Sequence, residues 1–157
     1  MEKPYFWEKA KKDLIKKDKA LGQIIKKYPK DFLFTKSKPF YTLARSIVGQ
    51  QISVSAAQAV WDRFETKAKL INPLTVKKMH YMTLKSCGLS KQKITYLKSL
   101  SNAFIEKRIQ PEKWESLNDE SIIEELIKIK GVGRWTAEMF LIFNLYKPNI
   151  FPVDDLG

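Results

Sequence analysis

Apolar residues recur every three or four positions through most of this chain of 157 residues, and few stretches alternate apolar and polar residues as a half-exposed strand would. This spacing predicts a mostly helical protein. Near the N-terminus, Phe6, Ala10 and Leu14 form one amphipathic stripe, and Leu21 and Ile24 belong to a second. Two helices are therefore expected before residue 28.

Capping residues mark helix boundaries in the middle of the chain. Gly49 is suited to end one helix and Ser53 to cap the next, which predicts a short loop between them. Gly88 and Ser90 repeat this pattern before a longer helix, and Asn118, followed by acidic residues, starts another. The chain therefore reads as a succession of helices without an internal repeat or a flexible linker.

A pair of glycines, Gly131 and Gly133, precedes a helix that is expected to begin at Arg134. Bare backbone N–H groups at the positive end of a helix form a general binding site for phosphate. A side chain at either glycine would obstruct the approach of a phosphate or the turn itself, whereas Val132 is expected to point inward and anchor the hairpin. An ordinary turn between two helices is the alternative interpretation.

Charge points to a polyanionic partner, because 29 Lys and Arg residues outnumber 17 Asp and Glu residues and give a net charge of +12. Solvated lysine-rich helix faces would explain the same excess.

One cysteine, Cys87, and one histidine, His80, offer no disulfide and no cluster of metal ligands. With no signal peptide and no membrane-length apolar run, the expectation is a cytoplasmic protein, bacterial and associated with the nucleoid through DNA, without a membrane partner.

Three ordered motifs carry a family resemblance. They read LARSIVGQQIS at residues 43–53, CGLSxxK at residues 87–93 and IKGVGRWTA at residues 129–137. With them, the chain resembles the helix-hairpin-helix DNA glycosylases over nearly its whole length, and in particular their alkylpurine branch, the DNA-3-methyladenine glycosylases of the inducible bacterial type. The resemblance implies an all-α fold of two facing helical bundles with a helix-hairpin-helix motif that binds DNA.

The same resemblance implies a division of the chain into three parts. Residues 1–36 would be N-terminal helices that pack on the bundle, residues 37–110 a helical subdomain with the Gln-Gln loop, and residues 111–157 the helix-hairpin-helix and the catalytic segment. Relatives continue through further helices after the catalytic acid. The fold is therefore expected to be truncated at its C-terminus.

The resemblance implies that DNA binds at two places: at the hairpin, and at the loop between the helix that Gly49 ends and the helix that Ser53 caps. The expected hairpin contacts are Lys130, Gly131, Val132, Gly133, Arg134 and Thr136, and those of the loop are Gln50, Gln51 and Ser53. Gln51 matches the position that fills the gap left by a flipped nucleotide, whereas Gln50 would equally serve as a helix cap. A monovalent cation between the hairpin carbonyls and the phosphate is implied as an option. No other cofactor and no side-chain metal site are expected.

Trp135 stands where the family's lyase branch carries a lysine that forms a Schiff base with the sugar. An indole has no nucleophilic amine, so simple hydrolysis without strand cleavage is predicted. The resemblance places Trp135 on the wall of the base pocket, where its ring would attract a cationic base such as 3-methyladenine. A plain core residue is the alternative.

The segment Phe151-Pro-Val-Asp-Asp-Leu-Gly157 offers the catalytic acid in two registers. The alkylpurine pattern selects Asp155, the preferred candidate, and the wider superfamily pattern selects Asp154. An ionised carboxylate would stabilise the cationic sugar and orient water. The expected function is thus a monofunctional glycosylase of base-excision repair that acts as a monomer on damaged double-stranded DNA. Alternatives are a non-catalytic DNA-binding module and a glycosylase for oxidised or mismatched bases.

Overall fold

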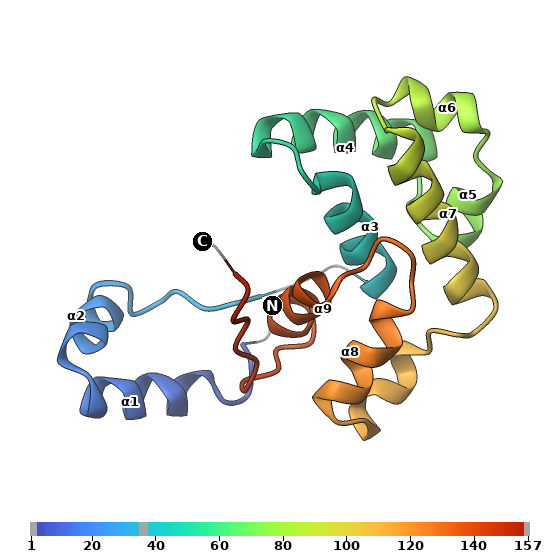
Figure 1. The fold of residues 1–157 in the computed structure, drawn as a ribbon. Coiled ribbons are helices and arrows are strands. Elements are labelled where there is room, and N and C mark those ends of the chain that lie inside the picture. The colour runs from blue at the N-terminus through green and yellow to red at the C-terminus, as the bar shows by residue number, and fades with distance from the viewer. Residues whose placement is uncertain (1–2, 35–37, 156–157) are drawn as a thin grey trace.

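The computed structural model describes residues 3–34 and 38–155, and within these residues all regular secondary structure is helical (Figure 1). The all-α prediction is therefore confirmed. In chain order the elements are α1 (Trp7–Lys17), α2 (Lys19–Lys27), α3 (Pro39–Gly49), α4 (Val54–Ala68), α5 (Pro73–Lys78), α6 (Tyr81–Ser86), α7 (Lys91–Ile105), the 3-10 helix η1 (Pro111–Ser116), α8 (Asp119–Ile127) and α9 (Arg134–Phe143).

The predicted caps form as expected. The Ser53 side chain accepts a hydrogen bond from the backbone N–H of Ala56 at the start of α4, at 3.3 Å. Ser90 does the same for Lys93 at the start of α7, at 3.2 Å. Each cap satisfies a backbone donor that the first helical turn leaves without a partner, so these sequence signals fix where the helices begin.

Helix α3 lies between two groups of helices, with α4 to α7 on one side and η1, α8 and α9 on the other (Figure 1). Side chains from both groups meet in a single hydrophobic cluster, which includes Leu43 and Ile47 of α3, Leu97 of α7 and Leu141 of α9. The ranges 37–110 and 111–157 of the sequence analysis therefore share one core. This common core holds the segments on either side of α3 in a fixed relation.

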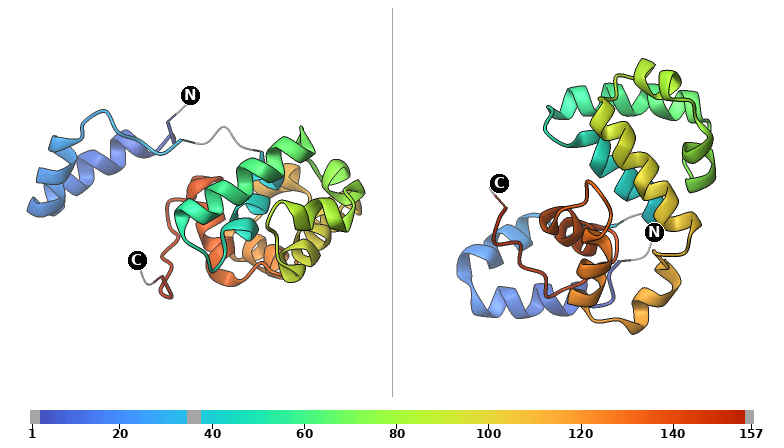
Figure 2. Two further views of the ribbon diagram at one scale, coloured as in Figure 1. Left: turned by 90° about the horizontal axis from the view of Figure 1, so that it is seen from above. Right: turned by 45° about the vertical axis from the view of Figure 1, so that its right-hand side comes forward.

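Helices α1 and α2 pack against each other and project away from the rest of the protein (Figures 1 and 2). Sequence analysis predicted that they pack on the bundle, and the structure differs. Gly22 of α2 lies against the Ile15 backbone of α1, where an added Cβ would sit 3.3 Å from the Ile15 carbonyl oxygen. The two helices cover their apolar stripes only in part, since Leu14, Leu21 and Ile24 stay exposed and α1 has no buried residue.

Helix α9 ends before the chain reaches Pro148. The helix ends at Phe143, and Asn144 occupies the C-cap position. The Asn144 side chain donates a hydrogen bond to Thr42 Oγ1 at 2.9 Å, which ties this end of α9 to α3. Tyr146 then has a φ of 56°, so the chain turns before it reaches the proline.

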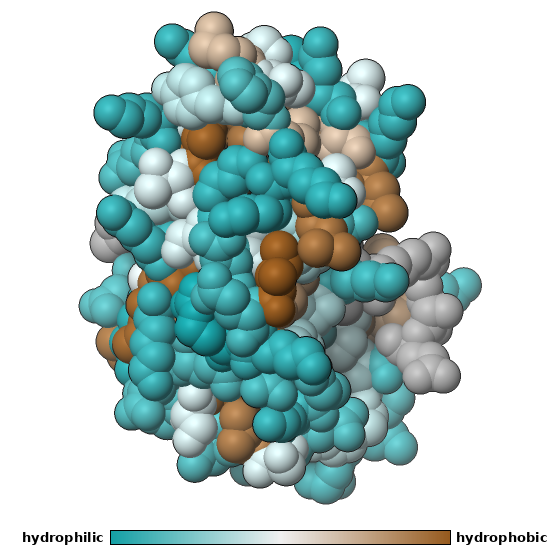
Figure 3. All heavy atoms as spheres, turned by 90° about the vertical axis from the view of Figure 1, so that its right-hand side faces the viewer, coloured by the Kyte–Doolittle hydropathy of each residue, from teal (hydrophilic) through white to brown (hydrophobic). Residues whose placement is uncertain are grey.

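The face formed by the right-hand side of Figure 1 is largely hydrophilic, with separate apolar patches between the polar side chains (Figure 3). Among the helices of the described residues, none has the length and apolar character needed to cross a membrane. The apolar patches are therefore small parts of a predominantly polar surface on this side of the protein.

Candidate nucleic-acid interface

A groove of about 930 Å³ lies where the loop between α3 and α4, the start of α7 and the hairpin between α8 and α9 come together. The loop and the hairpin are about eighty residues apart in sequence, and the fold places them on one surface. The sequence-predicted residues that line the groove are Gln50, Gln51, Lys130, Gly131, Val132, Gly133 and Thr136. Ser53 caps α4 beside it, and Arg134, Trp135 and the two candidate acids are not part of its lining.

Gly131 is required by the protein's own packing. Its φ of +93° is a conformation that residues with side chains rarely adopt, and an added Cβ would overlap the ring of Tyr96 from α7. Its carbonyl oxygen accepts a hydrogen bond from Gln50 Nε2 at 2.8 Å. Sequence analysis gave two reasons for a glycine here, the turn itself and the approach of a phosphate. The turn is sufficient to explain Gly131.

Gly133 is different, because among the described residues nothing beyond its two chain neighbours lies within 4 Å of an added Cβ. Its φ of −87° and ψ of 171° are extended backbone that other residues adopt readily. It is the N-cap residue of α9 and has no side chain to satisfy the first N–H groups of that helix. The N-terminus of α9 therefore presents open backbone donors, which is the geometry that a phosphate requires.

Val132 lies between the two glycines and points inward, with only 4% of its surface exposed, as predicted. Ile129 is equally buried, and its carbonyl oxygen accepts the Val132 N–H at 3.0 Å. The two apolar side chains anchor the turn in the core while the backbone at Gly133 stays accessible. Lys130 between them is exposed beside the groove, so its charge is available to an anion there.

Gln50 and Gln51 follow the last residue of α3 and have different environments. Gln50 is partly buried and is the C-cap residue of α3, where its backbone N–H donates to the Ile47 carbonyl, while its side-chain amide donates to the hairpin and not to a helix end. Gln51 is exposed and has a φ of 56°, which is unusual for a residue with a side chain. The loop thus holds one glutamine against the protein and presents the next one at the groove.

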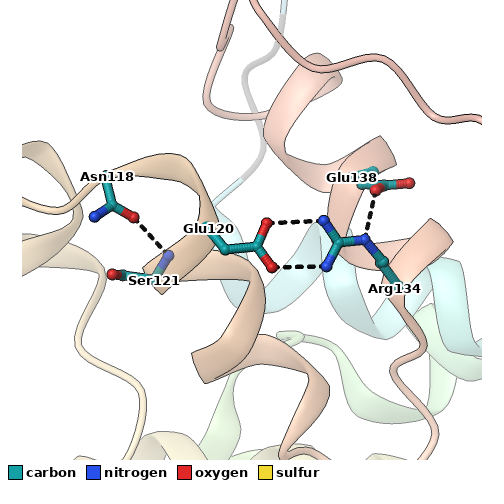
Figure 4. Close-up of polar contacts among 5 residues, drawn as sticks. All are labelled: Asn118, Glu120, Ser121, Arg134 and Glu138. Atoms are coloured by element: carbon teal, nitrogen blue, oxygen red, sulfur yellow. Dashed lines mark hydrogen bonds and ion pairs between the residues drawn. The ribbon is translucent and has the colours of Figure 1, made fainter.

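Arg134 at the start of α9 is bound by two carboxylates (Figure 4). Its Nη1 and Nη2 donate to the two Glu120 oxygens at 2.7 and 2.8 Å, and its Nε donates to Glu138 Oε1 at 3.0 Å. The hydrogen bond from Arg134 lowers the pKa of Glu120, and the same contact raises the pKa of Arg134. Arg134 therefore joins α8 to α9, and its contact with DNA stays a prediction.

Trp135 lies on the first turn of α9 and has 45% of its surface exposed. The alternative that this tryptophan is simply a core residue is wrong, because nearly half of the residue's surface is exposed. An exposed indole next to open backbone donors is available to a ligand that approaches the same helix end. Its place on the wall of a base pocket stays a prediction.

The two candidate acids lie in the segment that follows α9 and turns back beside it (Figures 1 and 2). Asp154 and Asp155 are both exposed, and the Asp155 N–H donates to the Pro152 carbonyl at 3.2 Å in a turn. Leu156 and Gly157, which complete the alkylpurine pattern, lie outside the described residues. Geometry at these two positions does not distinguish the registers, so Asp155 and its alternative Asp154 both stay predictions.

Comparison with known proteins gives the family of this chain. Residues 44–157 match the HhH-GPD superfamily of base excision DNA repair proteins. The chain belongs to this superfamily. Most of the sequence takes part in the match, including the Gln-Gln loop, the hairpin and both candidate acids.

Named relatives of this HhH-GPD chain include DNA-3-methyladenine glycosylase 1 of Schizosaccharomyces pombe, with 36% identity over 88% of the chain and 63% of the relative. DNA-3-methyladenine glycosylase of Saccharomyces cerevisiae is 37% identical over 75% of the chain and 43% of the relative. A solved structure of the S. pombe 3-methyladenine DNA glycosylase in complex with abasic DNA superposes with a TM-score of 0.81 at 34% identity, covering 94% of this chain and 75% of that one. The chain thus spans 63% and 43% of the two curated relatives.

Two residues of the HhH-GPD chain that sequence analysis did not assign support the groove from α7. Tyr96 packs beneath Gly131, and its hydroxyl accepts a hydrogen bond from Gln92 at 2.6 Å. Lys93 donates to the Val48 carbonyl at the end of α3, at 2.7 Å, and burial lowers its pKa. Lys93 is the last position of the second motif, so its spacing from Ser90 was a usable signal, whereas nothing local marked Tyr96.

No group of three or more His, Cys, Asp or Glu side chains within the described ranges is arranged to hold a metal ion. Cys87 is buried, and burial raises the pKa of its thiol. His80 is exposed and its Nδ1 accepts a hydrogen bond from the N–H of Met82 at the start of α6. Both residues therefore have structural explanations that need no part in the chemistry of this HhH-GPD chain.

Proposed function

We propose that this chain acts in base-excision repair as a DNA glycosylase that hydrolyses the N-glycosidic bond of alkylated purines. One observation carries the proposal: a single groove combines the open backbone at the start of α9 with the loop that presents Gln51. A glycosylase must grip the strand and keep the target nucleotide out of the stack at the same time, and these are the two elements that such work needs. The names of the relatives support alkylated purines as the substrate class.

The partner we propose is double-stranded DNA with a damaged base, bound by a monomer of the chain. A strand phosphate would lie on the free N–H groups that follow Gly133, with Lys130 adding positive charge beside it. A monovalent cation could bridge the phosphate to hairpin carbonyls. Because the Gly131 carbonyl already accepts the Gln50 amide, such a cation would rely on the neighbouring carbonyl groups.

Gln51 would occupy the gap that the flipped nucleotide leaves, since it is exposed at the groove and directly follows the glutamine fixed to the hairpin. Trp135 would meet the extruded base. Its half-exposed ring can stack on an alkylated purine, and the positive charge of such a base strengthens the contact. A neutral, undamaged purine would gain less from the same ring, which favours the damaged base.

The chemical step needs one carboxylate near the sugar. As the glycosidic bond breaks, the sugar becomes an oxocarbenium-like cation, which an ionised Asp155, or alternatively Asp154, would stabilise while it orients the attacking water. An alkylated purine already carries positive charge and leaves readily, so a strong general acid is not required. Because Trp135 has no amine, the product is an abasic site in an intact strand.

The test is base release from duplexes that contain 3-methyladenine, hypoxanthine, an oxidised guanine or a mismatched adenine, measured by chromatography for the wild-type chain, Asp155→Asn and Asp154→Asn. We expect release of the alkylated base by the wild type, its loss in Asp155→Asn, and an uncut strand. Loss only in Asp154→Asn would move the acid by one residue, and equal release in all three would remove both acids from the mechanism. Binding without any release would support a DNA-binding module instead.

A further inference from the structure

Gln50 makes a contact across the groove that its neighbours do not. Its backbone follows the last turn of α3, and its side-chain Nε2 donates to the carbonyl oxygen of Gly131, 81 residues away, at 2.8 Å. The bond is partly buried, so water competes with it less than at the open surface. One side chain therefore connects the loop that presents Gln51 directly to the backbone of the hairpin.

The hairpin end of this contact is held in place independently. Gly131 rests on the ring of Tyr96 so closely that a Cβ has no room, and the Tyr96 hydroxyl is fixed by Gln92. Val132 beside it is buried in the core. The acceptor oxygen is thus held in place without Gln50. The Gln50 side chain must therefore be positioned so that its amide reaches this oxygen.

The loop end is the part that needs support. Gln51 has a φ of 56° directly after the C-cap residue of α3, a left-handed conformation that ends helices but is less favourable for a residue with a side chain. On its C-terminal side the Ser53 cap fixes the start of α4. On its N-terminal side, Gln50 is bonded to the Ile47 carbonyl through its backbone N–H at 3.4 Å and to Gly131 through its side-chain amide, and the second of these contacts sets the loop against the hairpin.

We propose that Gln50 is a positioning residue that holds Gln51 in register with the hairpin, so that the gap-filling side chain and the phosphate grip engage one DNA at a fixed spacing. The inference rests on the proposed function of Gln51. It assigns the two adjacent glutamines separate tasks: Gln51 touches DNA, and Gln50 acts only through Gln51 and Gly131.

The first experiment needs no DNA. Gln50→Met keeps the length of the side chain and removes the amide donor, and Gln51→Ala is the matched change one residue further on. In backbone hydrogen exchange on the free protein, we expect Gln50→Met to speed exchange at residues 51–53 more than Gln51→Ala does, with little change at residues 129–133, which Tyr96 and Val132 hold independently. Unchanged exchange at residues 51–53 in Gln50→Met would overturn the proposal, whether or not the chain is a glycosylase.

The second experiment measures binding to a duplex with an abasic site and to an undamaged duplex, for the wild type, Gln50→Met, Gln51→Ala and the double variant. Loss of one hydrogen bond predicts about a tenfold weaker complex with abasic DNA for Gln50→Met, and little change for undamaged DNA. In the Gln51→Ala background the loss should shrink to within about twofold, because no gap-filling side chain is left to misplace.

Each alternative gives a different pattern. Equal weakening on both duplexes, or a full tenfold loss that persists in the double variant, would make Gln50 a general structural residue and overturn the positioning role. A wild-type chain that does not distinguish the two duplexes would contradict the proposed function. In that case the exchange experiment still decides whether Gln50 couples the loop to the hairpin.

Discussion

The two glycines of the hairpin stand two residues apart and are there for different reasons. Gly131 has a positive φ and lies against Tyr96, so the folded protein alone excludes a side chain at this position. Gly133 has extended backbone and open space around it, so the folded protein alone would accept many residues. The inner side of the hairpin, Gly131 and Val132, therefore serves the fold, and the outer side, Gly133 and the first turn of α9, is available to a ligand.

This difference shows that the two glycines of the hairpin motif need separate explanations. Both glycines look equivalent in a motif, and both fit the idea of a backbone that approaches a phosphate. Only at Gly133 does the protein leave the glycine unexplained, and this makes it the stronger pointer to DNA. Where the fold does not require a glycine, the approach of a ligand to the backbone is the explanation for the missing side chain.

Gly131→Ala should have the largest effect, and it should fall on stability. A left-handed conformation with a side chain and an overlap with an aromatic ring together predict a loss of about 2–4 kcal/mol in the free energy of unfolding. Denaturant unfolding measures it. Tyr96→Ala supplies the control, because Gly131→Ala should cost clearly less once the ring is gone. An unchanged unfolding midpoint would mean that the inner side is not tightly packed.

Gly133→Asp should separate stability from binding. Aspartate is a good N-cap and its charge suits the start of a helix, so unfolding should require up to about 1 kcal/mol more. The same carboxylate would occupy and repel the phosphate site, and we expect at least a tenfold loss in duplex affinity, by the electrostatics of phosphate contacts.

Gly133→Ala is the matched control for that experiment, since it adds a Cβ without charge. It should weaken DNA binding less than the aspartate does and leave the fold in place. If Gly133→Asp were destabilised, or if it bound duplex DNA as tightly as the wild type, the outer side of the hairpin would not be the ligand-facing side.

Trp135→Ala tests whether the ligand-facing side extends along the first turn of α9. Because 45% of the surface of Trp135 is exposed, removal of its side chain should change the unfolding midpoint only modestly. A cation over an aromatic ring is worth roughly 0.5–2 kcal/mol, so single-turnover release of 3-methyladenine should slow by about 2- to 30-fold. Trp135→Phe should recover part of the rate. A large loss of stability with unchanged release would assign Trp135 to the fold.

Much of this arrangement was predictable from sequence because it depends on local signals. The Ser53, Ser90 and Asn118 caps each satisfy a nearby backbone N–H, so a few adjacent residues determine them. The inward direction of Val132 follows from an apolar residue between two glycines. The family resemblance added the link between the Gln-Gln loop and the hairpin, which no local pattern contains.

What the sequence could not supply are contacts between distant segments. Nothing near Gly131 in the chain indicates that Tyr96 lies beneath it, or that the Gln50 amide reaches its carbonyl. Arg134 shows the same limit: a cation beside a phosphate-binding turn is a reasonable DNA contact until its partner Glu120 comes into view. Such roles depend on which helices pack together, and that is decided by the whole core.

Arg134 cannot be assigned to the inner or the outer side of the hairpin by its position alone. It lies on the first turn of α9, on the outer side, yet it is bound by Glu120 and the buried Glu138 (Figure 4). The pKa of Glu120 is lowered in the folded protein, mainly by the hydrogen bond from Arg134. A carboxyl with a lowered pKa stabilises the fold when it is ionised, and this contribution is lost as pH falls through its folded-state pKa.

Glu120→Gln should therefore have a small effect that depends on pH. Its melting temperature should lie slightly below that of the wild type at neutral pH, and the difference should close at acid pH, below the ordinary carboxyl range of about 4 to 5. Glu124→Gln removes the same charge from an exposed position on the same helix and is the matched control. If Glu120→Gln instead strengthens duplex binding at neutral pH, because it frees the guanidinium for a phosphate, Arg134 belongs with the outer side after all. If affinity is unchanged while the pH-dependent difference appears, Arg134 belongs to the fold.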